Sequence, residues 1–277
     1  MLSVIPFADG TGSITRHTEW SSQYVTPRPV DVWCPPEYAT SAARYPVIYM
    51  HDGKWLFDLA LLDGGVDWGI DEALTRLIKD THVPGAIVVG IWTGPQRTRE
   101  YMPQKPLETP EAQTLRERFR AEEEGNPMSD WYLQFLVNEV KPFIDRTYRT
   151  LPDQRHTSVM GSSMGGLISL YALVEYPEIF GGAGCLSTHW PIGENLLVDY
   201  LGRALPPAGS HRLYFDFGTA GLDEAYEPFQ QRMDTFVRAA GYEHGRDWLT
   251  CKFEGGEHTE AAWRDRVHLP LGFLLAE

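Results

Sequence analysis

The segment Gly161-Ser162-Ser163-Met164-Gly165 combines a serine with two glycines at a spacing that could support nucleophilic catalysis. It fits the Gly-x-Ser-x-Gly pattern, in which the serine stands at a sharp turn from a strand into a helix. The glycines suit this turn, because a Cβ would clash where strand and helix approach each other. The first amides of the helix favour negative charge beside the serine. Ser163 is therefore the predicted nucleophile, and the alternative is a glycine-rich connection without chemistry.

A serine hydroxyl is a weak nucleophile until a base accepts its proton, so the pattern predicts a histidine elsewhere in the chain. In an open parallel sheet, such residues lie beyond the carboxyl ends of the strands. Three of the nine histidines follow the penultimate predicted strand. His244 stands between a helix and the start of a strand, and His268 lies within the last helical segment. His258 directly follows the last strand, which makes it the predicted general base.

The same rule predicts the acid that would orient this histidine. Asp223 lies just past the predicted strand 212–218, and the chain order serine, acid, histidine is one that serine hydrolases use. Asp216 is the competing candidate, but it lies inside the strand, where a buried carboxylate is more often structural. Glu224 is a weaker candidate. The acid would fix the histidine tautomer and stabilise the imidazolium form.

An oxyanion hole needs two backbone amides that point at the developing negative charge. The residue after the nucleophile, Met164, supplies the first amide. The second should come from the loop 51–55 after an earlier strand, through the amide of Lys54 or Trp55. In this loop His51 and Asp52 have no third ligand at metal-binding spacing, so neither a metal nor a cofactor is predicted.

Several aromatic and basic residues follow strands on the same predicted edge. Together they could line a substrate pocket, although tryptophan in such proteins is equally often part of the core. The residues are Trp55, Trp92, Arg97, Arg99, Tyr101, His189 and Trp190.

Strands and helices alternate along most of the chain, which predicts an α/β fold with a mostly parallel central sheet and helices on both faces. The predicted strands are 45–50, 86–92, 157–161, 182–187, 212–218 and 248–254. The predicted helices include 70–78, 131–148, 164–175 and 223–240, with Pro142 expected to kink the second or start a new turn there.

Two regions depart from this alternation. Residues 1–44 are rich in turns, and their strand candidates, Gln23–Val25 and Val30–Trp33, are expected to form an antiparallel edge because prolines interrupt them. Residues 93–128 contain a charged helix over Leu115–Glu124 and are expected to be an insertion that overhangs the site. We expect one domain over residues 1–277.

The formal charge of −14 disfavours nucleic acid or an anionic membrane surface as a partner. The three cysteines are far apart and suit a reducing compartment. The stretch Met1–Ser13 does not have the form of a signal peptide, and the chain contains no stretch of transmembrane length, so a cytoplasmic location is expected. The sequence carries no pattern that indicates an oligomeric state.

These features together resemble the putative esterase family of α/β-hydrolases, and most of all its enterochelin-esterase-like and feruloyl-esterase-like branch. The resemblance implies an α/β-hydrolase fold and a serine esterase with Ser163 and His258 in the matching positions. Relatives often carry the acid two residues after a Gly-Thr pair, where this chain has Gly221, so Asp223 and Asp216 both remain candidates. The segments that carry the resemblance are Tyr49–Gly53, Gly90–Thr93, Arg99–Pro103, Gly161–Leu167, Tyr176–Phe180 and Gly256–Trp263.

The function predicted from these residues is hydrolysis of a small-molecule carboxylic ester through an acyl-enzyme intermediate. An acyltransferase or a thioesterase would use the same residues. A non-catalytic binding module is the alternative of a different class. Aryl esters, sugar acyl esters, siderophore lactones and small thioesters all remain open as substrates.

Overall fold

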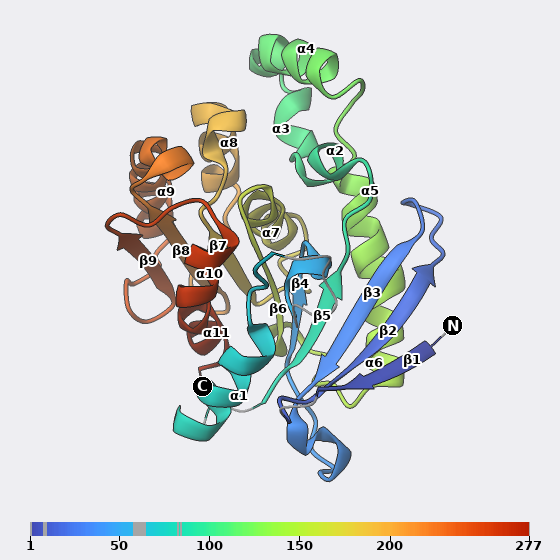
Figure 1. The fold of residues 1–277 in the computed structure, drawn as a ribbon. Helices are drawn as coiled ribbons and strands as arrows, with labels where there is room; N and C mark the ends of the chain where they lie inside the picture. The colour runs from blue at the N-terminus through green and yellow to red at the C-terminus, as the bar shows by residue number, and fades with distance from the viewer. Residues whose placement is uncertain (1, 8–9, 58–64, 82, 84, 277) are drawn as a thin grey trace.

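The computed structural model describes residues 2–7, 10–57, 65–81, 83 and 85–276. Within these residues one nine-stranded sheet has the order β1-β2-β3-β5-β4-β6-β7-β8-β9 (Figure 1). The six strands from β5 to β9 in that order are parallel, whereas β1, β2 and β3 are antiparallel. The predicted mostly parallel sheet is confirmed. The strands are β1 Leu2–Pro6, β2 Ser13–Trp20, β3 Arg28–Cys34, β4 Val47–Met50, β5 Ile87–Ile91, β6 Thr157–Ser162, β7 Gly182–Leu186, β8 Arg212–Gly218 and β9 Trp248–Phe253.

Helices cover both faces of the sheet, because successive side chains of its central strands are buried on opposite sides. In β4, Val47 and Tyr49 belong to the core cluster that includes side chains of α5 to α9, whereas Ile48 and Met50 belong to the cluster that includes side chains of α1, α10 and α11. The helices are α1 Ile70–Thr81, α2 Arg97–Tyr101, α3 Gln104–Glu108, α4 Gln113–Glu122, α5 Ser129–Gln134, α6 Lys141–Thr147, α7 Met164–Glu175, α8 Glu194–Arg203, α9 Glu227–Ala239, α10 Glu260–Arg266 and α11 His268–Leu275.

The amino-terminal strands differ in part from the prediction. Residues 1–44 do form an antiparallel edge, but Gln23–Val25 is not a strand, and Ser13–Trp20 is one that was not predicted. β3, which contains Val30–Trp33, lies inside the sheet between β2 and β5. Proline is tolerated there because Pro29 faces an irregularity in β2, where the pairing register shifts between His17 and Trp20.

The segment 93–128 forms α2, α3 and α4, and the last two project from one end of the molecule (Figure 1). The charged helix predicted over Leu115–Glu124 corresponds to α4. In the predicted helix 131–148, a π-helical stretch, Phe135–Val140, separates α5 from α6. Pro142 lies in the first turn of α6, so the interruption falls where proline cannot donate a backbone hydrogen bond.

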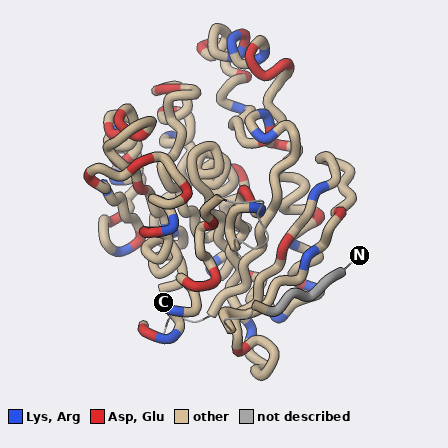
Figure 2. The backbone as a smooth tube through the Cα atoms, in the orientation of Figure 1, with Lys and Arg blue, Asp and Glu red and all other residues tan. Residues whose placement is uncertain are grey.

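Along the described backbone, Lys and Arg positions alternate with Asp and Glu positions in many segments (Figure 2). Each helix in the described ranges is too short or too polar to span a bilayer.

Candidate active site

Ser163 occupies a strained turn between β6 and α7. Its backbone has φ 58° and ψ −122°, a conformation that residues with a side chain rarely adopt. The turn brings strand and helix together so closely that a Cβ on Gly161 would lie 2.9 Å from the backbone of Gly165. The sharp turn predicted from the two glycines is therefore present, and it places the Ser163 hydroxyl at the carboxyl end of β6.

The loops that follow β8 and β9 bring two further side chains to Ser163. His258 Nε2 lies 2.9 Å from Ser163 Oγ, and His258 Nδ1 lies 2.6 Å from Asp223 Oδ1. The two loops touch because Gly218 has no side chain: a Cβ there would lie 2.0 Å from the carbonyl oxygen of Gly256. The structure thus brings together the three residues that were predicted from separate parts of the chain.

The Asp223 carboxylate is buried and lies in the 3₁₀ turn Gly221–Ala225 after β8. Its second oxygen, Oδ2, accepts hydrogen bonds from Ser187 Oγ at 2.6 Å and from the Gly218 amide at 2.7 Å. Burial alone would raise the pKa of this carboxyl, but the hydrogen bonds it accepts, that from His258 above all, hold its pKa below the usual value. Asp223 is therefore favoured as an anion, the form that can accept a hydrogen bond from His258 Nδ1.

Asp216, the competing candidate for the acid, contacts a different set of side chains. Its carboxylate accepts hydrogen bonds from Arg266 Nη2 at 3.0 Å and from the Tyr214 hydroxyl at 3.1 Å. Complete burial within β8 raises its pKa despite the neighbouring guanidinium. His258 is hydrogen-bonded to Asp223 instead, so the geometry favours Asp223 as the acid.

The amides predicted to hold negative charge beside Ser163 lie in two turns, and this role stays a prediction. Met164 is the first residue of α7, where an amide has no partner inside the helix. The 3₁₀ turn Gly53–Trp55 follows β4, and its Trp55 amide already donates to the Asp52 carbonyl oxygen at 2.9 Å. The Trp55 amide is therefore already used within this turn. For this reason we favour Lys54 over Trp55 as the predicted donor in this loop.

An ion pair forms the side of the site next to β4 and β5. Asp52, in the left-handed conformation with φ 57°, accepts two hydrogen bonds from Arg97, at 2.6 and 2.8 Å. The Arg97 guanidinium also lies 5.1 Å from the ring centre of Tyr101. The Tyr101 hydroxyl accepts a hydrogen bond from the Asp52 amide at 3.3 Å. The pair is close to the serine turn, since a Cβ on Gly165 would lie 3.3 Å from Asp52 Oδ2. Arg97 therefore stands beside the site with about a third of its side chain exposed.

Beneath this ion pair lies His51, which is buried. Its Nδ1 lies 2.7 Å from the hydroxyl oxygen of Tyr132. Burial, helped by the nearby charge of Arg97, lowers its pKa to about 3. His51 is therefore a neutral structural residue at physiological pH.

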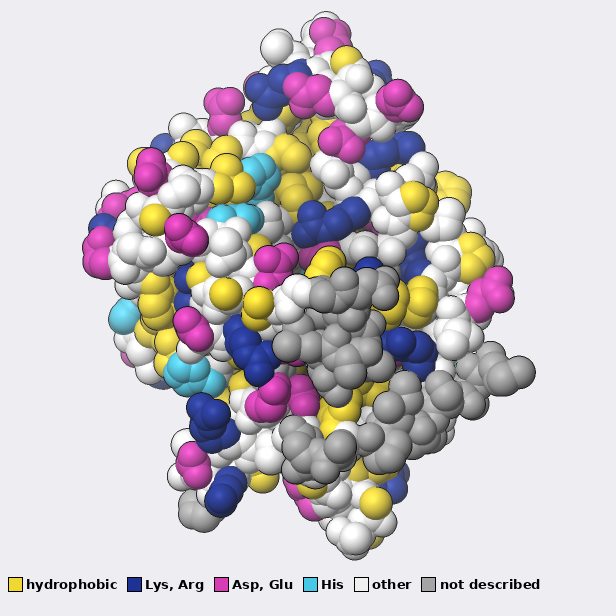
Figure 3. All heavy atoms as spheres, in the orientation of Figure 1, with side chains coloured by type: hydrophobic (Ala, Val, Ile, Leu, Met, Phe, Trp, Pro, Cys, Tyr) yellow, Lys and Arg dark blue, Asp and Glu magenta, His cyan; other side chains and the backbone are white. Residues whose placement is uncertain are grey.

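His189, one of the predicted pocket residues, lies beside His258. Its ring centre is 6.4 Å from that of His258, and its Nδ1 lies 2.6 Å from the Tyr226 hydroxyl oxygen. Burial, followed by the charges of His258 and Arg97, lowers its pKa to about 4. Figure 3 shows histidine side chains next to a Lys or Arg side chain and hydrophobic side chains in one hollow of the surface.

Four other predicted pocket residues contact the protein itself. Trp190 is buried, with its indole N–H donating to Gln230, and Tyr101 is completely buried. The indole N–H of Trp92 donates to Asp31 in β3, and Arg99 donates to the carbonyl oxygen of Asn126. Each of these side chains thus has a partner or a packed environment within the protein, and its role in binding substrate stays a prediction. Trp55 is half-buried after β4, and its role in binding substrate stays a prediction.

Two residues beside the site carried too little signal for their contacts there to be predicted. Arg97 was one of several arginines after β5, and only its contact with Asp52 distinguishes it from Arg99. Ser187 matches no motif, and its one signal is that it directly follows β7 at the predicted active edge.

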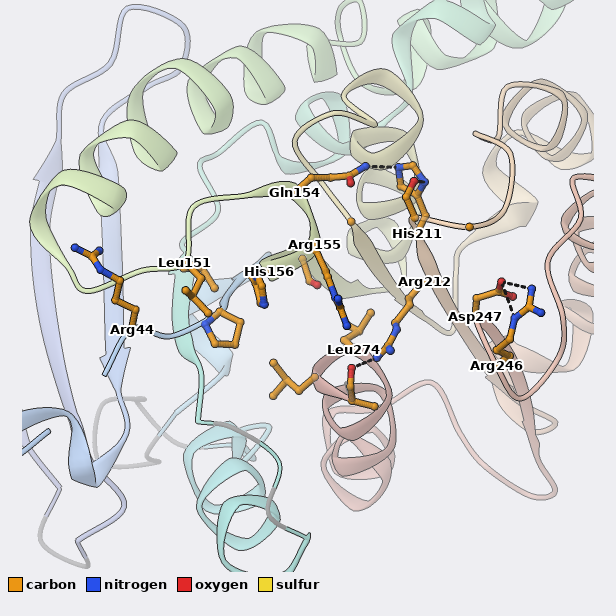
Figure 4. A pocket seen from close by; sticks show the side chains of 18 residues that line it. Arg44, Leu151, Gln154, Arg155, His156, His211, Arg212, Arg246, Asp247 and Leu274 are labelled. Atoms are coloured by element: carbon orange, nitrogen blue, oxygen red, sulfur yellow. Dashed lines mark hydrogen bonds and ion pairs between the residues drawn. The ribbon is translucent and has the colours of Figure 1, made fainter. Parts of the chain in front are cut away.

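A cavity of about 800 Å³ lies at the opposite edge of the sheet, around the amino ends of β4, β6 and β8 (Figure 4). In Figure 4, Arg155 and Arg212 point toward each other within it. Arg212 also donates to the Phe273 carbonyl oxygen at 3.1 Å, and Arg246 is paired with Asp247 at 3.0 Å. None of the residues grouped around Ser163 lines this cavity, so the two sites are separate.

Comparison with known proteins finds esterases. The model of the family described as "Putative esterase" matches residues 21–268. YbbA, an uncharacterised protein of Bacillus subtilis, is 26% identical over 209 residues, which are 75% of this chain and 72% of YbbA. The ferri-bacillibactin esterase BesA of the same organism is 30% identical over 160 residues, which span 53% of this chain and half of BesA.

Among solved structures, an IroE-like serine hydrolase from Shewanella oneidensis has the same fold. It superposes with a TM-score of 0.69 at 19% identity and covers 94% of this chain and 79% of that one. This likeness confirms the expected α/β-hydrolase fold, and the family match confirms the resemblance found in the sequence. The chain therefore belongs to the putative esterase family and is a serine esterase.

Proposed function

We propose that the protein hydrolyses small-molecule carboxylic esters through an acyl-enzyme intermediate, with Ser163 as nucleophile, His258 as general base and Asp223 as orienting acid. The observation that carries this proposal is the unbroken hydrogen-bond chain from Asp223 through His258 Nδ1 and Nε2 to Ser163 Oγ. An ionised Asp223 accepts from Nδ1–H, which leaves Nε2 free to accept the serine proton.

The reaction then follows from these positions. His258 takes the proton from Ser163 Oγ as this oxygen attacks the ester carbonyl, and the Met164 and Lys54 amides hold the resulting oxyanion. The C–O bond to the alcohol breaks as His258 returns the proton to the leaving oxygen. Water, deprotonated by the same histidine, attacks the acyl-enzyme and releases the carboxylic acid and Ser163.

The surroundings of the triad support a small substrate. His189 lies beside His258, and Arg97 is paired with Asp52 beside the serine turn. We infer that the insertion 93–128, which carries Arg97 in α2, forms part of the substrate site within a single domain. BesA is described as an esterase of ferri-bacillibactin, so siderophore lactones belong in any substrate panel, together with aryl and sugar acyl esters.

The decisive experiment measures p-nitrophenol release from a short-chain ester by the wild type, Ser163→Ala and the matched control Ser162→Ala. Ser162 is the neighbouring buried serine at the end of β6 and has no part in the proposed chemistry. We expect a burst from the wild type and the control, and a loss of kcat of at least about 10³-fold in Ser163→Ala.

Labelling with a fluorophosphonate separates this proposal from its alternatives. Folded wild type should be labelled at Ser163, and absence of label would favour a non-catalytic binding module. Adding an alcohol or thiol acceptor tests for acyl transfer: preferential transfer over hydrolysis would favour an acyltransferase. A thioester turned over faster than every oxygen ester would favour a thioesterase.

A further inference from the structure

Ser187, directly after β7, is completely buried and makes three side-chain hydrogen bonds. Its Oγ donates to Asp223 Oδ2 at 2.6 Å. The same oxygen accepts from the indole N–H of Trp263 at 3.1 Å and from Nη2 of Arg266 at 2.8 Å. A serine outside every motif thus contacts the carboxylate that is bonded to His258.

The chemistry of these partners determines where the Ser187 proton lies. A hydroxyl has one proton to donate and two lone pairs with which to accept. Trp263 and Arg266 can only donate, so together they occupy both lone pairs. The single proton is therefore directed at Asp223, which as a carboxylate can only accept.

The rest of the network fixes Ser187 itself. Its amide donates to the carbonyl oxygen of Asp216 at 2.9 Å, and its backbone has φ 39°, which a residue with a side chain keeps only when its surroundings impose it. The buried Asp216 also holds the Arg266 guanidinium at 3.0 Å. Asp216, unsuited as the triad acid, thus anchors the residue that donates to that acid.

We infer that Ser187 is a positioning residue for catalysis: its hydroxyl, polarised by Trp263 and Arg266, holds the Asp223 carboxylate so that Oδ1 faces His258. This inference rests on the proposed triad and assigns a further residue to it. Without the hydroxyl, Asp223 loses one of the two donors to Oδ2 and can rotate, so His258 is held less firmly with Nε2 toward Ser163.

The first test compares Ser187→Ala with Ser169→Ala, in ester hydrolysis by the full chain with the concentration of active sites counted by fluorophosphonate titration. Ser169 is an equally buried serine whose hydroxyl donates to the Gly165 carbonyl oxygen within α7. We expect Ser187→Ala to lower kcat per active site about 10- to 100-fold, as for a lost bond to a charged group, with KM changed less than about threefold. Ser169→Ala should leave both values close to those of the wild type.

Ser187→Gly repeats the test without a side chain, since glycine adopts φ 39° readily. It should fold even if Ser187→Ala does not, and it should show the same loss of kcat. A normal kcat in a folded Ser187→Gly variant would overturn the inference.

A double-mutant cycle with Asp223→Ala shows whether Ser187 acts through this carboxylate. If it does, adding Ser187→Ala to Asp223→Ala should change kcat by less than about twofold, because the residue to be positioned is gone. If the kcat losses of the two single variants multiplied in the double variant, the inference would be overturned and Ser187 would have a structural role. An equal fall in kcat for Ser169→Ala would do the same.

The wild type and Ser163→Ala, run alongside, separate the two proposals. If Ser163→Ala keeps wild-type kcat, the proposed function fails. If Ser163→Ala is inactive and Ser187→Ala is as active as the wild type, only the inference about Ser187 fails.

Discussion

The two sides of the site at the carboxyl edge of the sheet use polar residues in opposite ways. On the side of β6 to β9, Asp223, His258 and Ser163 form a hydrogen-bond chain that ends at a hydroxyl facing the site. On the side of β4 and β5, Asp52 and Arg97 satisfy each other through two hydrogen bonds. The first arrangement lets His258 exchange a proton with Ser163 Oγ, whereas the second has a fixed charge distribution.

This difference indicates a division of labour. A histidine held between a carboxylate and a hydroxyl suits proton transfer, because the carboxylate stabilises the imidazolium that forms when the hydroxyl loses its proton. A closed bidentate pair is rigid and cannot give up a proton in the physiological range, so it suits the placement of a substrate. The comparison predicts that changes on the triad side lower kcat, whereas changes on the ion-pair side act on KM.

The largest effect should come from Asp223→Ala. Removal of the carboxylate leaves His258 without its orienting partner, so kcat is expected to fall about 10³- to 10⁴-fold with little change in KM. Steady-state kinetics with a p-nitrophenyl ester measure both values. If Asp216→Ala lowered kcat per folded molecule equally, the assignment of the acid would have to be exchanged.

Asp216→Ala is expected to act on stability first. It would leave the Arg266 guanidinium buried without its carboxylate, which should lower the free energy of unfolding by about 3 to 5 kcal/mol. Urea denaturation followed by circular dichroism measures this change. Asp199→Ala, which breaks an exposed pair with Arg232, is the control and should have a much smaller effect.

His51 should make stability depend on pH. Its pKa in the folded protein is about 3, below the ordinary value of 6.5, so the unfolded chain binds a proton first as the pH falls. The free energy of unfolding therefore decreases from about pH 6.5 toward pH 3, by up to ~1.4 kcal/mol per pH unit from this residue. Urea titrations at pH 7 and pH 5 measure this change. Between these two pH values, the free energy of unfolding of His51→Gln should fall by about 2 kcal/mol less than that of the wild type. An equal loss in both proteins would show that His51 is protonated when folded.

Arg97→Ala should have the smallest effect and sharpens the comparison most directly. Arg97 contacts Asp52 and Tyr101 but none of the three triad side chains, so we expect KM to rise about tenfold and kcat to change less than threefold. Arg99→Ala is the matched control, because its guanidinium bonds to Asn126. A loss of kcat larger than the rise in KM would contradict the division between the two sides.

The sequence predicted the fold and the grouping of the triad residues for one physical reason. The carboxyl ends of neighbouring parallel strands meet at one edge, so residues just after β6, β8 and β9 must lie close together. β2 was missed because its residues, Ser13 to Trp20, are mostly polar and only Ile14 is completely buried. Gln23–Val25 was too short for its composition to indicate a strand reliably.

The direction of each side chain could not be predicted from strand ends. Trp92 and Trp190 both follow strands at the active edge, yet their indole groups bond to Asp31 and Gln230. Which of several loop residues faces the site depends on backbone turns that appear only in the fold. The left-handed conformation of Asp52, which brings its carboxylate to Arg97, is one such turn.

The positive φ angles around the site also bear on how this protein could be stabilised. Ser163 and Ser187 directly follow β6 and β7, and Asp52 lies two residues after the end of β4. Glycine would adopt the positive-φ backbone conformation of each with less strain. At Asp52 and Ser187 the relief of strain is opposed by the loss of the hydrogen bonds to Arg97, Trp263 and Arg266. At Ser163, selection for heat resistance alone would favour glycine, and this replacement would remove the proposed nucleophile. Stability and activity are thus in direct conflict here, and thermostable variants that stay active should carry their substitutions away from this edge.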